Sequence, residues 1–168
     1  MLFLLWLGCD VPVVRPVAVP SGFAVRGIDV SHHQGWIDWE QVAGSGDVDF
    51  VFVKATEGGS HEDRRFRRNW REARAQGLRV GAYHYFSLCR TGKAQAAHFI
   101  ATVPVEPDAL PPVVDIEPDG RCNRGDRLDR VNAEVSAWVD AVEAHYGVAP
   151  LVYSGSRFDR THLEVTGR

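Results

Sequence analysis

Two carboxylates stand one residue apart at the end of an apolar run in VVDIEPDG, residues 113–120. In a β-strand, residues i and i+2 point to the same face and lie roughly 6.6 Å apart. We therefore expect Asp115 and Glu117 to project together, with Ile116 facing the opposite way. Because mutual repulsion and burial both disfavour a second charge, the pKa of one of the two acids should rise. A protonated acid beside an ionised one is the pair that glycoside hydrolysis requires.

The same pair also has a structural interpretation. Loop acids commonly accept hydrogen bonds from backbone N–H groups or bind a metal ion, and neither role involves acid catalysis. The backbone spacing alone does not choose between these roles, and it does not decide between retaining and inverting geometry. Further carboxylates would have to converge on the pair to favour catalysis.

Further acids and tyrosines do end the neighbouring apolar runs. Asp29 stands in GIDVSHHQG and Glu57 ends FVFVKATE, although an Asx-turn or a salt bridge would explain each of them separately. Tyr83 and Tyr85 stand in GAYHYF, and Tyr153 stands in LVYS. Functional residues of parallel α/β folds gather at the C-terminal ends of the strands, so these positions together favour one shared site.

The histidines suggest a metal site, but their spacing does not support one. Those that could in principle meet Asp115 around zinc are His32, His33, His61 and His84. No HxxxH or HExxH motif occurs, and the adjacent His32 and His33 would point in opposite directions in an extended chain. The sequence also lacks a glycine-rich phosphate loop, and YSGSR is not the nucleophile elbow GxSxG. We therefore expect neither a metal nor a cofactor.

Composition and charge argue against a nucleic-acid partner. The 168 residues are 45% hydrophobic and 24% charged, with a formal net charge of −3, as in an ordinary globular domain. The basic run RRFRRNWREAR places Phe66 and Trp70 on one helical stripe, which favours a solvated helix face over a nucleic-acid patch. We expect a monomer.

Residues 1–24 are expected to precede the folded domain of residues 25–168. The apolar run that opens MLFLLWLGCD is shorter than half of the roughly 20 residues that span a bilayer, and no Lys or Arg precedes it. It could be the remnant of an export signal or membrane anchor, a lipoprotein-type site at Gly8–Cys9, or an N-terminus without function. The three prolines of VPVVRPVAVP then predict an extended linker.

Strand and helix signals alternate along the rest of the chain. Short runs rich in Val, Ile, Phe or Tyr predict strands over residues 25–31, 49–56, 79–86, 112–117 and 150–154. Helical spacing predicts helices over residues 62–76, 93–102 and 126–146, with a short one over 36–43. Gly77 and Gly147 stand where left-handed helix caps belong. The alternation predicts an α/β fold with a parallel sheet, and five strands are too few to close an eight-stranded barrel. An open barrel would expose the apolar flanks of its first and fifth strands.

Five ordered blocks resemble the glycoside hydrolase family 25 lysozymes, the Chalaropsis-type N-acetylmuramidases: GIDVSHHQG, FVFVKATEGG, GLRVGAYHYF, PPVVDIE and PLVYS. The resemblance runs from about Arg26 to the C-terminus. It implies an irregular TIM-like β/α barrel that cleaves the β-1,4 bond between N-acetylmuramic acid and N-acetylglucosamine in peptidoglycan. Members of the family continue with further strands, so we expect a C-terminally truncated domain with about five of the eight barrel strands.

Matched by position, the resemblance makes Glu117 the proton donor. It gives Asp115 and Asp29 the tasks of stabilising the transition state or orienting the N-acetyl group of the substrate. The partner would be the glycan strands of peptidoglycan. The substrate-binding positions that it implies are Tyr83, Tyr85, Glu57 and Tyr153.

Cys89 and Cys122 follow the third and fourth predicted strands, whose loops are neighbours in a parallel barrel. A disulfide between them would fit a periplasmic or extracellular location, and two free thiols are the alternative. Two other function classes stay open: a non-catalytic peptidoglycan-binding or degenerate remnant of such an enzyme, and a metal-dependent hydrolase that a chelator would inactivate.

Overall fold

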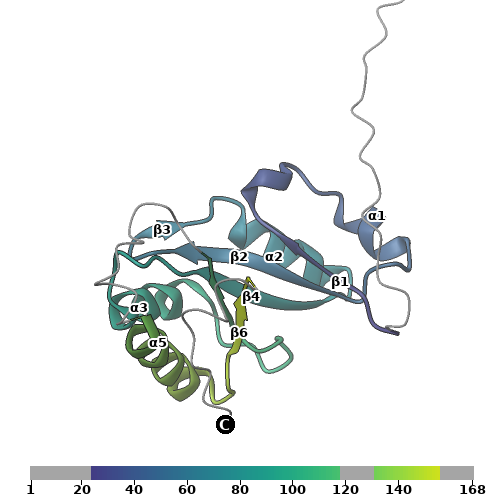
Figure 1. The fold of residues 1–168 in the computed structure, drawn as a ribbon. Helices are drawn as coiled ribbons and strands as arrows, with labels where there is room; N and C mark the ends of the chain where they lie inside the picture. Colours follow the sequence, from purple (N-terminus) through teal and green to yellow (C-terminus); the bar gives the residue numbers. More distant parts are fainter. Residues whose placement is uncertain (1–23, 118–130, 156–168) are drawn as a thin grey trace, which may run out of the picture.

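Five parallel strands form a curled sheet in the computed structural model, which describes residues 24–117 and 131–155 (Figure 1). Neighbouring strands follow the order β1-β2-β4-β5-β6, and each pair along this path is parallel. This is an α/β fold with about five strands of an irregular TIM-like barrel, as the sequence predicts. The strands are β1 (Gly27–Val30), β2 (Phe50–Glu57), β4 (Arg79–Tyr85), β5 (Val113–Ile116) and β6 (Leu151–Ser154).

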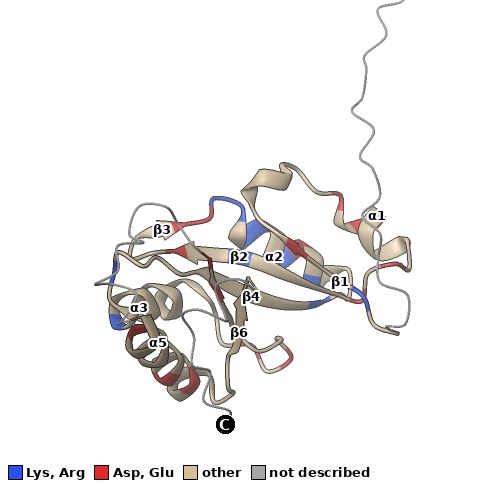
Figure 2. Cartoon of the chain, viewed as in Figure 1, with Lys and Arg blue, Asp and Glu red and all other residues tan. Residues whose placement is uncertain are grey.

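Helices connect the strands, and α2, α3 and α5 pack on one face of the sheet. None of the described helices is long and apolar enough to cross a membrane. Figure 2 shows arginines along α2 and acidic residues along α5. The helices are η1 (His32–Gln34), α1 (Trp39–Gly44), α2 (Phe66–Ala75), α3 (Gly92–Thr102) and α5 (Val131–Tyr146).

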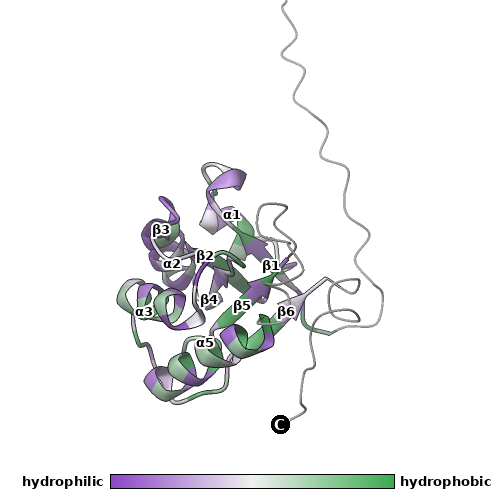
Figure 3. Cartoon of the chain, turned by 60° about the vertical axis from the view of Figure 1, so that its left-hand side comes forward, coloured by the Kyte–Doolittle hydropathy of each residue, from purple (hydrophilic) through white to green (hydrophobic). Residues whose placement is uncertain are grey.

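The core lies between the sheet and these helices. Figure 3 shows hydrophobic residues concentrated along strands such as β5 and β6 and on parts of the helices. Large aromatic side chains bury roughly 150–250 Å² each, so a few of them account for much of the stabilisation. Fully buried side chains come from the strands (Val51, Val53, Val80, Val114, Ile116) and from the helices (Phe66, Phe99, Trp138).

One buried polar network fastens the sheet to α3 and α5. His84 places Nδ1 2.7 Å from Thr56 Oγ1 and Nε2 3.1 Å from Gln95 Oε1. Because Gln95 Oε1 also accepts from the backbone N–H of Ser87, His84 donates through Nε2 and Thr56 donates to Nδ1. Burial lowers the pKa of His84 to about 4, so the ring is neutral. The imidazole stacks on Trp138 with 5.7 Å between ring centroids.

A β-bulge interrupts β2 between Lys54 and Thr56. Lys54 pairs with Tyr83 of β4, and Thr56 pairs with the next residue, His84, so Ala55 is an extra residue in β2. An extra residue reverses the alternation of the side chains that follow it. Thr56 therefore reaches His84 on the helix-covered face, and the residue after Thr56 returns to the opposite face.

The helix predicted over residues 62–76 begins later, at Phe66. Residues His61–Glu62 form the short strand β3, which pairs antiparallel with the end of β2 and was not predicted. Asp63 then makes a turn in which its Oδ1 accepts from the backbone N–H of Arg65. A strand of two residues is too short to show an alternating pattern, so the helix predicted from the sequence began too early, at residue 62.

Other boundaries follow from capping. The helix predicted over residues 36–43 spans Trp39–Gly44, because Asp38 accepts from the backbone N–H of Gln41 and so begins the helix. Gly77 and Gly147 have φ values of 81° and 71°, which confirms their prediction as left-handed caps. Positions 126–130, the predicted start of the last helix, lie outside the described residues.

The fifth parallel strand, β6, is more exposed than a strand buried on both faces. Leu151 is 49% exposed, Val152 41% and Tyr153 56%. Within the described ranges, β6 pairs with β5 on one side. This exposure agrees with the predicted apolar flank of an open barrel.

Gly92 provides a test of the close packing between α3 and α5. A Cβ added at Gly92 would lie 1.8 Å from the backbone oxygen of Glu134. We expect Gly92→Ala to lower the free energy of unfolding by about 1–3 kcal/mol, measured by urea unfolding, because α5 must move away. The control is Gly44→Ala in α1, where a Cβ meets nothing within 4 Å and helix propensity favours alanine. Equal losses in the two variants would contradict close packing as the cause.

Candidate active site

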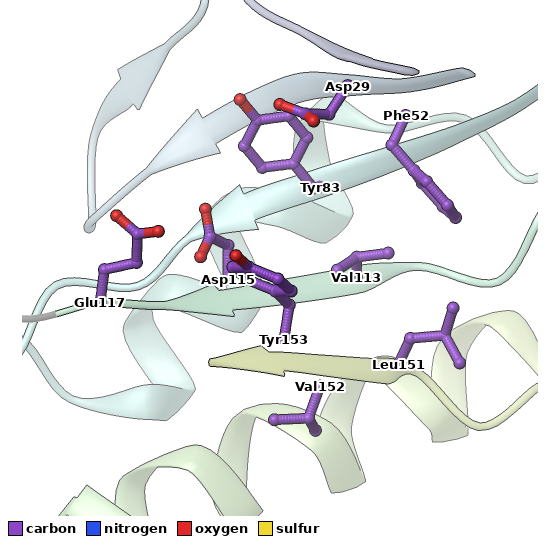
Figure 4. A pocket seen from close by; sticks show the side chains of 9 residues that line it. All are labelled: Asp29, Phe52, Tyr83, Val113, Asp115, Glu117, Leu151, Val152 and Tyr153. Carbon is purple, nitrogen blue, oxygen red and sulfur yellow. The ribbon is translucent and has the colours of Figure 1, made fainter. Parts of the chain in front are cut away.

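A pocket of about 530 Å³ opens on the face of the sheet opposite α3 and α5 (Figure 4). Its polar side chains gather toward the C-terminal ends of the strands, and its apolar side chains lie toward the strand starts. One end is therefore suited to polar chemistry and the other to apolar contact. The polar lining consists of Asp29, Tyr83, Asp115, Glu117 and Tyr153, and the apolar lining of Phe52, Val113, Leu151 and Val152.

Strand alternation places the acids in this pocket. Asp115 on β5 and Glu117 just beyond it both line the pocket, while Ile116 between them is fully buried on the other face. Asp29 reaches the same pocket from β1, across β2 and β4. The curl of the sheet brings these strand ends together, and Figure 4 shows the three carboxyl groups directed into one space.

Asp115 has an altered proton affinity. Burial, followed by the negative charge of Glu117, raises its pKa to about 7. The positive charge of Lys54 lowers this pKa and the negative charge of Asp29 raises it, and both effects are weaker than those of burial and Glu117. In the described part of the chain, Asp115 Oδ1 is buried without a hydrogen-bond partner. Near neutral pH, Asp115 therefore holds a proton about half of the time. The sequence predicts a raised pKa for one of the two acids, and in the structure that acid is Asp115.

Tyr83 stands among the carboxyl groups with its hydroxyl beside Asp29 (Figure 4). Burial raises the pKa of Tyr83 far above its usual range, and the charges of Asp29 and Asp115 raise it further. Ser31 hydrogen-bonds to the Tyr83 side chain and partly opposes this rise. The hydroxyl therefore stays protonated at any physiological pH and can donate a hydrogen bond into the pocket.

Two predicted substrate-binding residues do not line the pocket. Tyr85 pairs with Asp115 across β4 and β5, and the Lys54 ammonium lies 4.7 Å from its ring centroid. Glu57 forms a 2.7 Å ion pair with the same ammonium. Lys54 was not among the residues predicted from the sequence, although a lysine inside the apolar run FVFVKAT was the available signal.

The histidines do not gather around Asp115. His84 lies on the opposite face of the sheet, within the core. His32 Nδ1 lies 2.6 Å from Asp63 Oδ2, and its ring lies 4.0 Å from that of His33. These two residues belong to the 3₁₀ helix η1 and not to an extended segment, so their rings are adjacent. Across residues 24–117 and 131–155, no three His, Cys, Asp or Glu side chains form a metal-binding group.

Cys89 lies in the loop between β4 and α3 and is disulfide-bonded. Cys122, its predicted partner, lies outside the described residues. The bond of Cys89 rules out the alternative that this thiol is free. The pairing with Cys122 itself stays a prediction.

The sequence profile described as Glycosyl hydrolases family 25 matches residues 28–167. The chain belongs to this family. Escherichia coli (strain K12) YegX is 39% identical over 151 residues, covering 88% of this chain and 54% of the relative. Lysozyme M1 of Streptomyces globisporus is 34% identical over 141 residues, covering 80% of this chain and 46% of the relative. A solved family 25 glycosyl hydrolase from Bacillus anthracis has a TM-score of 0.83 and 33% identity, covering 89% of this chain and 69% of that one.

Membership of family 25 confirms the resemblance found in the sequence. The chain spans about half the length of the curated relatives that it matches. The solved family 25 hydrolase has the same fold over most of this chain. The catalytic and substrate-binding roles of individual residues remain predictions.

Asp115 should make the protein less stable as pH rises. Its pKa is about 7 in the folded chain, whereas the ordinary value of an aspartate, 3.8, applies to the unfolded chain. Between these two pH values the folded state keeps a proton that the unfolded state has lost. The free energy of unfolding therefore falls from about pH 4 to about pH 7. Asp115→Asn removes this loss, and we expect it to unfold at least about 3 °C above the wild type at pH 8 in thermal unfolding.

Asp140→Asn is the matched control, because Asp140 occupies an exposed position of α5. It should keep the pH dependence of the wild type. A melting curve of Asp115→Asn that runs parallel to the wild type from pH 4 to pH 8 would contradict the raised pKa.

Proposed function

We propose that this chain is a peptidoglycan hydrolase of the lysozyme type. It would cleave the β-1,4 bond between N-acetylmuramic acid and N-acetylglucosamine by carboxylate acid catalysis. The observation that carries the proposal is one pocket that holds Asp29, Asp115 and Glu117, with a proton retained near neutral pH. Glycoside hydrolysis needs a protonated acid and an ionised carboxylate on the two sides of the scissile bond. Family 25 membership and relatives that carry the name lysozyme support the same reaction class.

Glu117 is the proposed proton donor. Its charge is, after burial, the main reason for the raised pKa of Asp115, so the two carboxyl groups lie close enough to interact electrostatically. In the proposed reaction, Glu117 passes a proton to the leaving oxygen of the glycosidic bond. Asp29 adds negative charge that stabilises an oxocarbenium-like sugar, and Tyr83 donates a hydrogen bond that orients the N-acetyl group.

The rest of the pocket suits a sugar ring. Sugars have apolar ring faces and polar edges, and here apolar side chains such as Phe52 and Leu151 lie beside the acids (Figure 4). Tyr153 is 56% exposed at the pocket wall, and its ring can stack on a sugar. These features support glycan strands of peptidoglycan as the partner.

The proposed substrate places the protein outside the cytoplasm, in the periplasm or the extracellular space. The disulfide of Cys89 supports such an oxidising environment. A membrane tether at the N-terminus would fall on positions that lie outside the described residues.

Glu117→Gln tests the proposed donor, because the amide keeps the shape of the side chain and cannot transfer the proton. We expect the release of reducing ends from purified peptidoglycan sacculi to fall by at least about 100-fold. Glu40→Gln makes the same chemical change at an exposed position of α1 and should leave release unchanged.

Release by Glu117→Gln at the wild-type rate would reject Glu117 as the donor. A wild-type protein that sediments with sacculi but releases no reducing ends would support a glycan-binding role in place of hydrolysis. Loss of wild-type release in the presence of a chelator would support a metal-dependent hydrolase.

A further inference from the structure

Lys54 is a buried lysine on the pocket side of the sheet. Its side chain is 9% exposed, and it follows the pocket residue Phe52 by two positions, so both side chains project from the same face of β2. An ammonium group is rarely buried unless partners compensate for the lost hydration. The partners of Lys54 therefore indicate its task.

Glu57 is the first partner, and the bulge in β2 brings it into reach. Residues three apart on a regular strand point to opposite faces. Because Ala55 is an extra residue, Lys54 pairs with Tyr83 and Glu57 pairs with Tyr85, and these two tyrosines share one face of β4. The Lys54 ammonium accordingly lies 2.7 Å from Glu57 Oε2.

Tyr85 is the second partner, and it connects the lysine to the acids. Its ring centroid lies 4.7 Å from the Lys54 ammonium, within the range of a cation–π interaction. Tyr85 is also the cross-strand neighbour of Asp115. Lys54 lowers the pKa of Asp115, against burial and the charges of Glu117 and Asp29, which raise it.

We propose that Lys54 is a positioning residue of the acidic pocket, whose ammonium, paired with Glu57 and held over the ring of Tyr85, controls whether Asp115 holds a proton. Its catalytic meaning rests on the proposed function, but the electrostatic effect does not depend on hydrolysis. Glu57 weakens the influence of the lysine, because a negative charge at 2.7 Å offsets much of its field. The other titratable groups that face or act on this cluster are Asp29, Asp63, Tyr83, Tyr85, Glu117 and Tyr153.

The proposal predicts opposite effects for two substitutions. Lys54→Met removes the positive charge and keeps the length of the side chain, so the midpoint of Asp115 titration should rise by about 1 pH unit. Glu57→Gln leaves the lysine charge unopposed, so the same midpoint should fall by up to about 1 pH unit. The measurement is the ¹³C chemical shift of the Asp115 carboxyl carbon against pH, assigned with Asp115→Asn.

A general loosening of the pocket would let water reach Asp115 in both variants and lower both midpoints. A midpoint in Lys54→Met that falls or does not move would therefore overturn the proposal. Lys54→Arg keeps the charge and should titrate as the wild type does, and a rise equal to that of Lys54→Met would also overturn it. If Lys54→Met fails to fold, Lys54→Gln takes its place: a rise of the midpoint supports the proposal, and a fall or an unmoved midpoint rejects it.

The titration uses the protein without substrate, so it separates the two proposals. Opposite midpoint shifts in a protein that does not cleave sacculi would reject hydrolysis and keep the role of Lys54. Unmoved midpoints in a protein that does cleave sacculi would reject the role of Lys54 and keep hydrolysis.

Discussion

The extra residue Ala55 in β2 decides how both faces of the sheet are used. Before the bulge, Lys54 projects toward the pocket, and directly after it Thr56 projects toward the helices, where it donates to His84. The following residue, Glu57, then returns to the pocket side and meets Lys54. A regular strand would send Thr56 and Lys54 to the same face, and the core would lose a partner for its buried histidine. The buried network and the charge pair beside the pocket thus depend on one shift of register.

On the helix-covered face of the sheet, the hydrogen-bonded network around His84 supports the pocket on the opposite face. His84 is neutral and fully satisfied, since it donates to Gln95, accepts from Thr56 and stacks on Trp138. Its chain neighbours on β4, Tyr83 and Tyr85, point the other way, toward the acids. A buried polar group that is completely hydrogen-bonded favours one packing arrangement over its alternatives. The tyrosines are therefore held by a residue that never contacts the pocket.

On the pocket face of the sheet, three carboxyl groups lie near the buried ammonium of Lys54. Burial increases the cost of ionising Asp115, and the negative charges of Glu117 and Asp29 increase it further. The pocket lowers this cost by keeping a proton on Asp115 and by placing Lys54 nearby. This arrangement lowers the free energy of unfolding at neutral pH, and such a loss is common at sites that hold a titratable group with a shifted pKa.

The sequence by itself determined the family, the α/β fold and the order of its strands, because hydrophobic periods and strand-end blocks are local properties of the chain. It also determined that Asp115 and Glu117 share a face, since that follows from strand alternation. It failed at β3, where two residues carry no period, and at Lys54, whose partner Glu57 stands at a spacing that a regular strand forbids.

Only the tertiary structure decided which acid keeps the proton and which residues reach the pocket. The pKa of Asp115 depends on burial and on charges contributed by β1 and β2, which are far away along the chain. The bulge exists only as a pairing between β2 and β4, so no single strand contains it. Strand periodicity is a property of neighbouring residues, whereas desolvation and charge coupling are properties of the assembled sheet.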